Sequence, residues 1–210
     1  MPRTFTDRFE QRKATRSKLV DAALKLFATS GYEHATVDDI SQEAGYSKGA
    51  YYFHFSTKDD ILLELLRMWT DDRTNALTAA VVDGEPEGTV RGMLEGLFSY
   101  DAAPQWPAVL LEFWSQALRH PEVSKRLSQA YGGWRKQLAE AFATAVDAGA
   151  LHIDTPDDAA SIALAAHDGH AVQVAIGSPG TRAMSAGELA DTLLTPLKIA
   201  EPGVRRAAAM

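Results

Sequence analysis

The 210-residue chain contains no cysteine. This absence excludes disulfides, thiolate metal sites and thiol redox sensing, and it is compatible with a reducing compartment. No apolar run is long enough to cross a membrane, and residues 1–16 are too polar for a secretory signal. The sequence therefore predicts a cytoplasmic protein with no membrane partner.

Signatures of catalysis are also scarce. The sequence has no phosphate-binding loop and no HExxH metal site, and the stretch GSPG near residue 178 is typical of a loop. His167 and His170 have a spacing that could supply two metal ligands, but no third ligand stands at a fixed distance from them. We therefore expect no enzymatic activity, no cofactor and no metal, and interpret the two histidines as polar groups of a pocket or subunit interface.

Positive charge is scarce over most of the chain, which has a net charge of −7. Residues 1–35 hold seven basic and four acidic side chains, a balance of +3, whereas residues 61–210 hold twelve and nineteen, a balance of −7. Because salt screens charges that lie more than about 8–10 Å apart, a locally basic face is sufficient for contact with DNA. The N-terminal part therefore remains a candidate for nucleic-acid binding.

Helical periodicity dominates the sequence, and strand-like alternation is absent. A first helix ends at Gly31 and carries an apolar stripe of Leu19, Ala22, Ala23, Leu26 and Phe27. Thr36, with Asp39 behind it, then opens a short helix that stops at Gly45, and Ser47 caps a second short helix that begins at Lys48. Ser56 or Thr57 opens a longer helix that runs to the break at residues 83–88.

Five further helical segments follow, at residues 88–101, 107–120, 121–149, 156–177 and 185–196. Gly132 and Gly133 lie inside the third of them and predict a kink or a close helix contact. The fourth is apolar on nearly every face, so it requires neighbours on several sides, and a second subunit is one source of them. The chain is therefore predicted to be all-α.

The two short helices predict a helix-turn-helix. In DNA-binding versions of this arrangement the first residues of the second helix meet base edges in the major groove. Here Lys48 can donate to a guanine or a phosphate, and the small residues Gly49 and Ala50 allow close approach. Tyr52 and His54 can donate to phosphate oxygens.

Three stretches, "AALKLFATSGYEHATVDDIS", "EAGYSKGAYYFHF" and "KDDILLELL", lie within an ungapped match from Lys18 to Leu66 that resembles the TetR family of bacterial transcriptional regulators. The resemblance implies phosphate contacts from Thr36, Tyr52, His54 and Lys58, and base contacts from Ser47, Lys48 and Gly49. Tyr51 stands where the family more often has leucine, so it is expected to pack inward or against the groove wall. Phe53 and Phe55 would pack the recognition helix onto the first helix.

The resemblance also implies a domain organisation. Residues 1–56 would form the DNA-binding domain, with a disordered arm at about 1–13. Residues 57–200 would form a larger helical domain for ligand binding and dimerisation, and residues 201–210 a disordered tail. The expected lining of the effector pocket is Met68, Met93, Leu97, Phe98, Leu110, Phe113, Trp114, Phe142 and His167, and for each of these residues ordinary core packing is an open alternative.

The sequence thus predicts a repressor that binds double-stranded operator DNA as a homodimer on a palindrome. A small hydrophobic or aromatic effector would release it. Two alternatives stay open at this point. One is an all-α small-molecule carrier or enzyme without a DNA-binding role, and the other is a protein that packages DNA without sequence preference.

Overall fold

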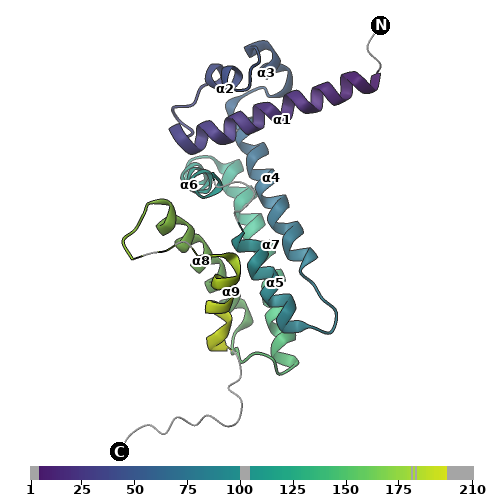
Figure 1. The fold of residues 1–210 in the computed structure, drawn as a ribbon, viewed down its shortest axis with the longest axis vertical. Coiled ribbons are helices and arrows are strands. Elements are labelled where there is room, and N and C mark those ends of the chain that lie inside the picture. Colours follow the sequence, from purple (N-terminus) through teal and green to yellow (C-terminus); the bar gives the residue numbers. More distant parts are fainter. Residues whose placement is uncertain (1–4, 100–104, 181, 183, 198–210) are drawn as a thin grey trace, which may run out of the picture. The chain divides into compact units, whose positions relative to one another are not determined.

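The computed structural model describes residues 5–99, 105–180, 182 and 184–197. Within them the chain is all-α, as predicted (Figure 1). The helices are α1 Phe5–Ser30, α2 Val37–Glu43, α3 Lys48–His54, α4 Lys58–Ala79, α5 Pro86–Phe98, α6 Trp106–Ala117, α7 Pro121–Asp147, α8 Pro156–Ala175 and α9 Ala186–Leu194, with a short 3-10 turn at Thr195–Leu197.

The chain forms two compact units. Unit 1 consists of Met1–Asp71 and Tyr100–Ser128, and unit 2 consists of Asp72–Ser99 and Gln129–Met210. Helices α1, α2, α3 and α6 belong to unit 1, α5, α8 and α9 belong to unit 2, and α4 and α7 contribute to both. The predicted boundary after residue 56 is a functional division, and it stays a prediction.

The caps predicted for unit 1 are present. The Asp39 backbone N–H donates to Thr36 Oγ1 over 3.1 Å, and the Thr36 N–H donates to Asp39 Oδ2 over 3.0 Å, which is a capping box. Ser47 Oγ accepts the Ala50 N–H over 3.2 Å. Since these caps satisfy N–H groups that a helix start leaves open, α2 and α3 can form with seven residues each.

Unit 1 is assembled around α1. α2 packs against α1, α3 packs against α2, and α6 packs against α1 as well (Figure 1). The core contains the α1 stripe residues Leu19 and Phe27 together with Ile40 of α2 and Tyr51 of α3, all buried. Leu26, expected in the same stripe, is only half-buried.

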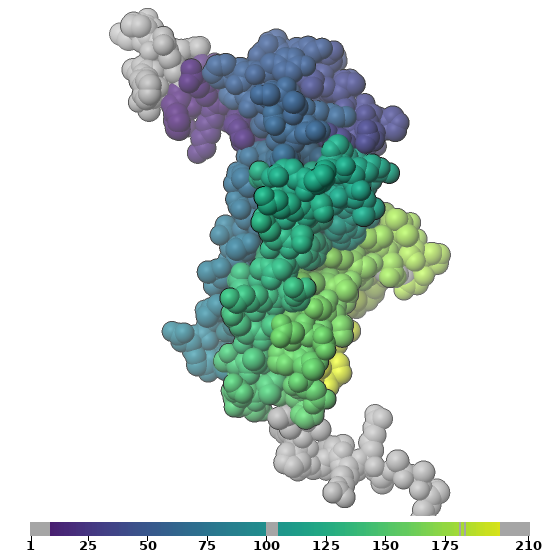
Figure 2. Space-filling view, turned by 180° about the vertical axis from the view of Figure 1, so that it is seen from behind, coloured from purple at the N-terminus to yellow at the C-terminus, as the bar shows by residue number. Residues whose placement is uncertain are grey.

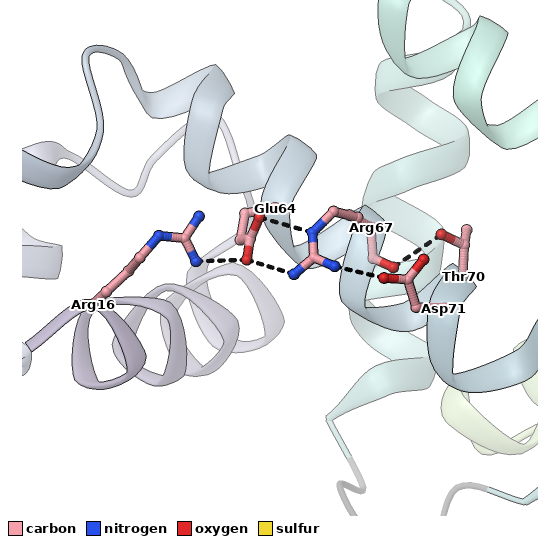
Figure 3. A network of polar contacts seen from close by, with 5 residues as sticks. All are labelled: Arg16, Glu64, Arg67, Thr70 and Asp71. Atoms are coloured by element: carbon pink, nitrogen blue, oxygen red, sulfur yellow. Dashed lines mark hydrogen bonds and ion pairs between the residues drawn. The ribbon is translucent and has the colours of Figure 1, made fainter. Parts of the chain in front are cut away.

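A polar network joins α1 to the first part of α4 (Figure 3). Arg16 Nη1 lies 2.6 Å from Glu64 Oε1, and Arg67 Nη2 donates to the same oxygen over 2.9 Å. Arg67 also pairs with Asp71. The hydrogen bonds from Arg16 and Arg67 lower the pKa of Glu64 to about 2, so this carboxylate is charged at any ordinary pH.

In unit 2 a close helix contact lies at a different glycine from the predicted pair. A Cβ added to Gly96 of α5 would stand 2.8 Å from the Ala76 Cβ of α4, so the two helices could not pack as they do with a larger residue there. A Cβ at Gly132 or Gly133 would meet no atom within 4 Å. The predicted close contact at Gly132 and Gly133 is therefore wrong, and α7 runs through them unbroken.

The chain ends require one correction. Helix α1 begins at Phe5, so the prediction of a disordered arm at about 1–13 is wrong for residues 5–13. The tail at 201–210 lies outside the described residues. In the part of the chain that is described, no helix has both the length and the apolar character needed to cross a membrane.

Candidate nucleic-acid interface

Helix α3 has an inner and an outer face. Tyr51 and Phe55, four residues apart, are 0% and 4% exposed, whereas Tyr52 is 51% exposed and Lys48 is exposed as well. This division follows from the helix period, since residues i and i+4 lie on the same side. The aromatic run from Tyr51 to Phe55 therefore serves both the core and the surface.

Tyr51 anchors the helix. Its hydroxyl donates to the Thr57 carbonyl oxygen over 2.9 Å, and its ring lies 5.7 Å from that of Phe55. Burial raises the pKa of the Tyr51 hydroxyl, which remains neutral. Of the two placements predicted for Tyr51, packing inward is the one observed, because the side chain is buried and its hydroxyl ties α3 to the start of α4. The prediction that it also contacts DNA at the groove wall is wrong.

The outer face presents Lys48, Gly49 and Tyr52. Lys48 Nζ donates to Asp38 Oδ2 of α2 over 3.0 Å, and this hydrogen bond raises the pKa of the lysine. Both side chains of the pair are more than half exposed, so the ammonium can leave the carboxylate for a phosphate or a base. The Tyr52 ring contacts the buried Tyr51 ring edge-on, with the two ring centres 5.6 Å apart.

The C-terminal end of α3 departs from the prediction. Phe53 is 63% exposed, so it meets the first helix at the surface and not in a buried interface. Its ring lies 5.1 Å from the Arg12 guanidinium of α1, and the edge of the His54 ring is also 5.1 Å away. Phe55 does pack as predicted, beneath the Arg16 guanidinium at 4.8 Å.

His54 is half-buried at this end of α3. Burial, together with the charges of Arg16 and Arg12, lowers its pKa, so the imidazole is neutral at pH 7. A neutral imidazole still offers one N–H donor to a phosphate. Arg12 was not singled out by the sequence analysis. The local excess of basic residues at 1–35 was the signal that could have identified it.

The two predicted phosphate contacts at helix starts are differently placed. Thr36 is exposed, but its hydroxyl donates to Asp39 Oδ2 over 2.6 Å and would have to leave the capping box to donate to a phosphate. Lys58 Nζ donates to three carbonyl oxygens, those of Tyr32, Glu33 and Ala35, over 2.6, 3.3 and 3.0 Å. Since an ammonium has three donors, the phosphate role predicted for the Lys58 side chain is not supported.

Residues 45–49 have the GxSxG spacing of a nucleophile elbow, but their structure is different. Gly45 adopts φ +75° in the turn between α2 and α3, and Ser47 leads directly into α3 as its N-cap. A nucleophile elbow follows a strand, and the described residues contain none. Ser47 is therefore a helix cap at the predicted interface.

The nine predicted pocket residues divide between the units. Met68, Leu110, Phe113 and Trp114 belong to unit 1, and Met93, Leu97, Phe98, Phe142 and His167 belong to unit 2. Met68 is 39% exposed, whereas Phe113 is fully buried. In unit 2, Met93 forms part of the wall of a cavity of about 380 Å³ between the α4–α5 connection and α7, which the other eight do not line.

A polar cluster lies within the apolar interior of unit 2. Asp168 Oδ2 accepts the Tyr131 hydroxyl over 2.7 Å, and Asp168 Oδ1 lies 2.9 Å from His167 Nδ1. The His167 ring stacks on Phe98 at 5.2 Å, and Tyr131 meets Trp134 edge-on at 5.3 Å. His167 and Phe98 were predicted from the sequence as pocket residues, whereas Asp168 and Tyr131 were not. The helical period could have placed Tyr131 on the same side as Trp134, but no sequence signal joins α7 to α8.

Comparison with known proteins agrees with this arrangement. The profile described as bacterial regulatory proteins, tetR family, matches residues 19–65, and that of the BetI-type transcriptional repressor, C-terminal, matches residues 86–197, more than half of the chain. The chain belongs to the TetR family. Helices α2 and α3 are therefore the helix-turn-helix of a TetR-family DNA-binding transcriptional regulator.

Individual relatives match different parts of the TetR-family chain. The regulator YwcC of Bacillus subtilis is 50% identical over 56 residues, which is 27% of this chain and 25% of that protein. The regulator BetI of Agrobacterium fabrum is 31% identical over 150 residues, 70% of this chain and 69% of that one. A regulator from Saccharomonospora viridis, solved in complex with choline, is 25% identical with a TM-score of 0.73, covering 85% of this chain and 92% of its own.

Proposed function

We propose that this TetR-family protein is a ligand-responsive repressor that binds a palindromic operator as a homodimer in the cytoplasm. The observation that carries this proposal is the outer face of α3, where Lys48, Gly49 and Tyr52 are exposed on a helix anchored by Tyr51. Side chains placed in this way can read base edges and phosphates. Names of relatives, including the BetI-type repressor, support repression.

The proposed homodimer would form through α8. Ile162 on this helix and Ile176 directly after it are 65% and 67% exposed, with Ala165, Ala166 and Gly169 between them. Figure 2 shows α8 and the turn after it, in light green, at the surface of unit 2. An exposed apolar face of this kind favours association, and a twofold dimer would present two recognition helices to two half-sites of a palindrome.

The effector is proposed to bind in unit 2, near Asp168. The Asp168 side chain is 18% exposed and contacts Tyr131 and His167, and the His167 ring stacks in turn on Phe98. Aromatic faces beside a partly buried carboxylate suit a small, largely apolar molecule with one polar or cationic end. Choline is a reasonable first compound to test, because the Saccharomonospora viridis relative binds it.

Release would occur by a population shift. Helix α4 contributes its first part to unit 1, directly after the helix-turn-helix, and its last part to unit 2, so a change at the effector could reach the helix-turn-helix through it. An effector shifts the equilibrium only if it binds the released state more tightly than the operator-bound state.

A DNase footprint and a gel shift with the DNA upstream of the protein's own gene test the function. We expect a palindromic footprint, and replacement of Lys48 by Ala should reduce the preference for this site over random DNA. Equal affinity for random DNA would indicate packaging, and no binding at low salt would leave the carrier or enzyme alternative. If bound effector leaves operator affinity unchanged, release by ligand is wrong, whereas the DNA-binding role stands.

A further inference from the structure

Helices α1 and α3 enclose a hollow beside the exposed outer face of α3. It has a volume of about 370 Å³. Its lining includes Arg12 of α1, Tyr46 of the turn between α2 and α3, and Ala50, Phe53 and His54 of α3. The spacing i, i+3 and i+4 places the three α3 residues on one side of that helix, next to the side that presents Lys48 and Tyr52. The hollow therefore lies on the flank of the recognition helix.

The charge of this hollow is positive. Arg12 contributes a guanidinium, and the lining contains no carboxylate, since its two further members, Gln11 and Thr15, are uncharged. The other hollows are different. The cavity in unit 2 has Asp83 and Glu140 in its wall, and a hollow between α1 and α2 is lined by both lysines and carboxylates. The space between α1 and α3 therefore suits an anion.

Arg12 is available to such an anion. The side chain is exposed, and it takes part in no ion pair with any side chain that the structure describes. Its guanidinium lies over the Phe53 ring, 5.1 Å from the ring centre. This contact restricts a long side chain before any ligand arrives, and a guanidinium can donate to two oxygens of one phosphate.

His54 adds a donor from α3. Its ring contacts the Phe53 ring edge-on, with the ring centres 5.1 Å apart. Burial and the charges of Arg16 and Arg12 lower the pKa of His54, so the neutral imidazole carries one N–H. The hollow is thus provided with donors from two different helices.

The dimensions of DNA place a phosphate at this flank. A helix with its side chains is about 10–12 Å across, and the major groove is about 12 Å wide. When α3 lies in the groove with Lys48 toward the bases, its flanks face the two sugar-phosphate walls. Figure 1 shows the N-terminal half of α1 running past α3 and beyond it. One groove wall can therefore meet α1 and α3 together.

We propose that the hollow between α1 and α3 binds a phosphate of the DNA backbone, held by the Arg12 guanidinium of α1 and the His54 N–H of α3. Arg12 is then a DNA contact outside the helix-turn-helix, and Phe53 is the residue that positions it. The proposal rests on DNA binding through α3. Because the contact is made to the backbone, it strengthens binding to every sequence alike.

Fluorescence anisotropy of the full chain tests the contact, with a random-sequence duplex and the DNA upstream of the gene over a series of salt concentrations. Arg12→Met should weaken binding to both duplexes about fivefold at low salt and lower the salt slope by about one for each bound subunit. Lys13→Met removes the same charge from the next position of α1, which is exposed and does not line the hollow, and should leave both quantities nearly unchanged. Melting midpoints of both variants should match that of wild type.

Phe53→Leu tests the positioning without a change of charge. We expect it to weaken binding to both duplexes about two- to threefold, since the guanidinium loses the ring that restricts it. Combined with Arg12→Met, it should cause no further loss, because the ring acts through the guanidinium. An equal loss in both backgrounds would contradict the positioning role of Phe53.

Wild-type affinity and salt slope in Arg12→Met would overturn the proposal. Equal effects of Arg12→Met and Lys13→Met would overturn it as well, because net charge would then account for the loss. Lys48→Ala separates this failure from failure of the proposed function. If Lys48→Ala loses its preference for the upstream DNA while Arg12→Met binds as wild type does, α3 reads DNA and the phosphate site is wrong.

Discussion

At the scale of single residues, Lys48 on the outer face of α3 forms an ion pair with Asp38 at the protein surface. Asp38 accepts Lys48 Nζ over 3.0 Å, and both groups are exposed. DNA phosphates must compete with this carboxylate for the ammonium and also approach its negative charge. Asp38→Asn should therefore tighten DNA binding by about two- to fivefold at low salt, measured by fluorescence anisotropy over a series of salt concentrations.

The control for this prediction is Asp147→Asn, which makes the same charge change at an exposed position on α7 in unit 2. It should leave DNA affinity unchanged. If the two variants behave alike, net charge accounts for the effect, and Lys48 is not a DNA contact that Asp38 restrains.

Lys58 is the residue for which structure and family resemblance give opposite expectations. Its ammonium satisfies the carbonyl oxygens of the buried residues Tyr32 and Ala35. Lys58→Met keeps the aliphatic stem but leaves these acceptors without their donor, so we expect a loss of about 2 kcal/mol of folding free energy. Thermal unfolding should show a lower midpoint for Lys58→Met and an unchanged midpoint for Lys48→Met.

DNA affinity then separates the two lysines. Measured well below the melting midpoint, it should fall for Lys48→Met and stay close to wild type for Lys58→Met. A Lys58→Met protein that keeps its midpoint and loses DNA affinity would restore the phosphate role that the family resemblance implies.

At the scale of elements, α1 and α4 are held together by Glu64. Hydrogen bonds from Arg16 and Arg67 lower its pKa from 4.5 to about 2. A carboxyl whose folded pKa is depressed contributes stability above its unfolded pKa and loses it as pH falls through the folded value. The contribution of Glu64 should therefore be complete above about pH 5 and disappear between pH 4.5 and about 2.

Glu64→Gln tests this linkage. The two arginines are 41% and 49% exposed, so water screens the pair, and we expect a loss of about 1–2 kcal/mol at pH 7. Melting midpoints of wild type and variant at pH 7, 5 and 3 should differ almost equally at the first two values and by a smaller amount at the third. A difference that does not change with pH would contradict the ion pair. Glu122→Gln, in an exposed pair with Arg126, should have little effect at any pH.

Elements were more predictable from sequence than the directions of their side chains. Caps are local chemistry, so Thr36 and Ser185 could be identified as helix starts from residues within three positions of them, and both form capping boxes. Gly96 could not be identified as a close helix contact, because the Ala76 it meets lies twenty positions away along the chain and packs against it only in the folded unit.

The candidate site shows the same limit. The helical period separates Tyr51 from Tyr52, but it does not reveal that Thr57 offers Tyr51 a hydrogen-bond acceptor or that Arg12 covers Phe53. Both contacts come from neighbouring elements. Asp168 was missed for the same reason, since its partner Tyr131 is on another helix.

At the scale of the whole molecule, the proposal that the exposed face of α8 forms the dimer interface predicts how operator binding responds to a change there. Ile162 is 65% exposed there and lies beside small residues that allow a second helix to approach. Ile162→Asp would place a charge within this proposed contact, where burial against a second subunit would leave it without solvent or a partner. We expect the variant to sediment as a monomer and to bind a full operator no more tightly than a half-site.

Leu118→Asp is the matched control, because Leu118 is 89% exposed at the end of α6 in unit 1. It adds the same charge at an apolar surface position outside α8, and it should leave both the dimer and operator affinity intact. Analytical ultracentrifugation gives the mass of each variant, and anisotropy with full and half operators gives its affinity. If Ile162→Asp remains a dimer with wild-type affinity, the α8 face is not the interface, and the two recognition helices must be paired through another surface.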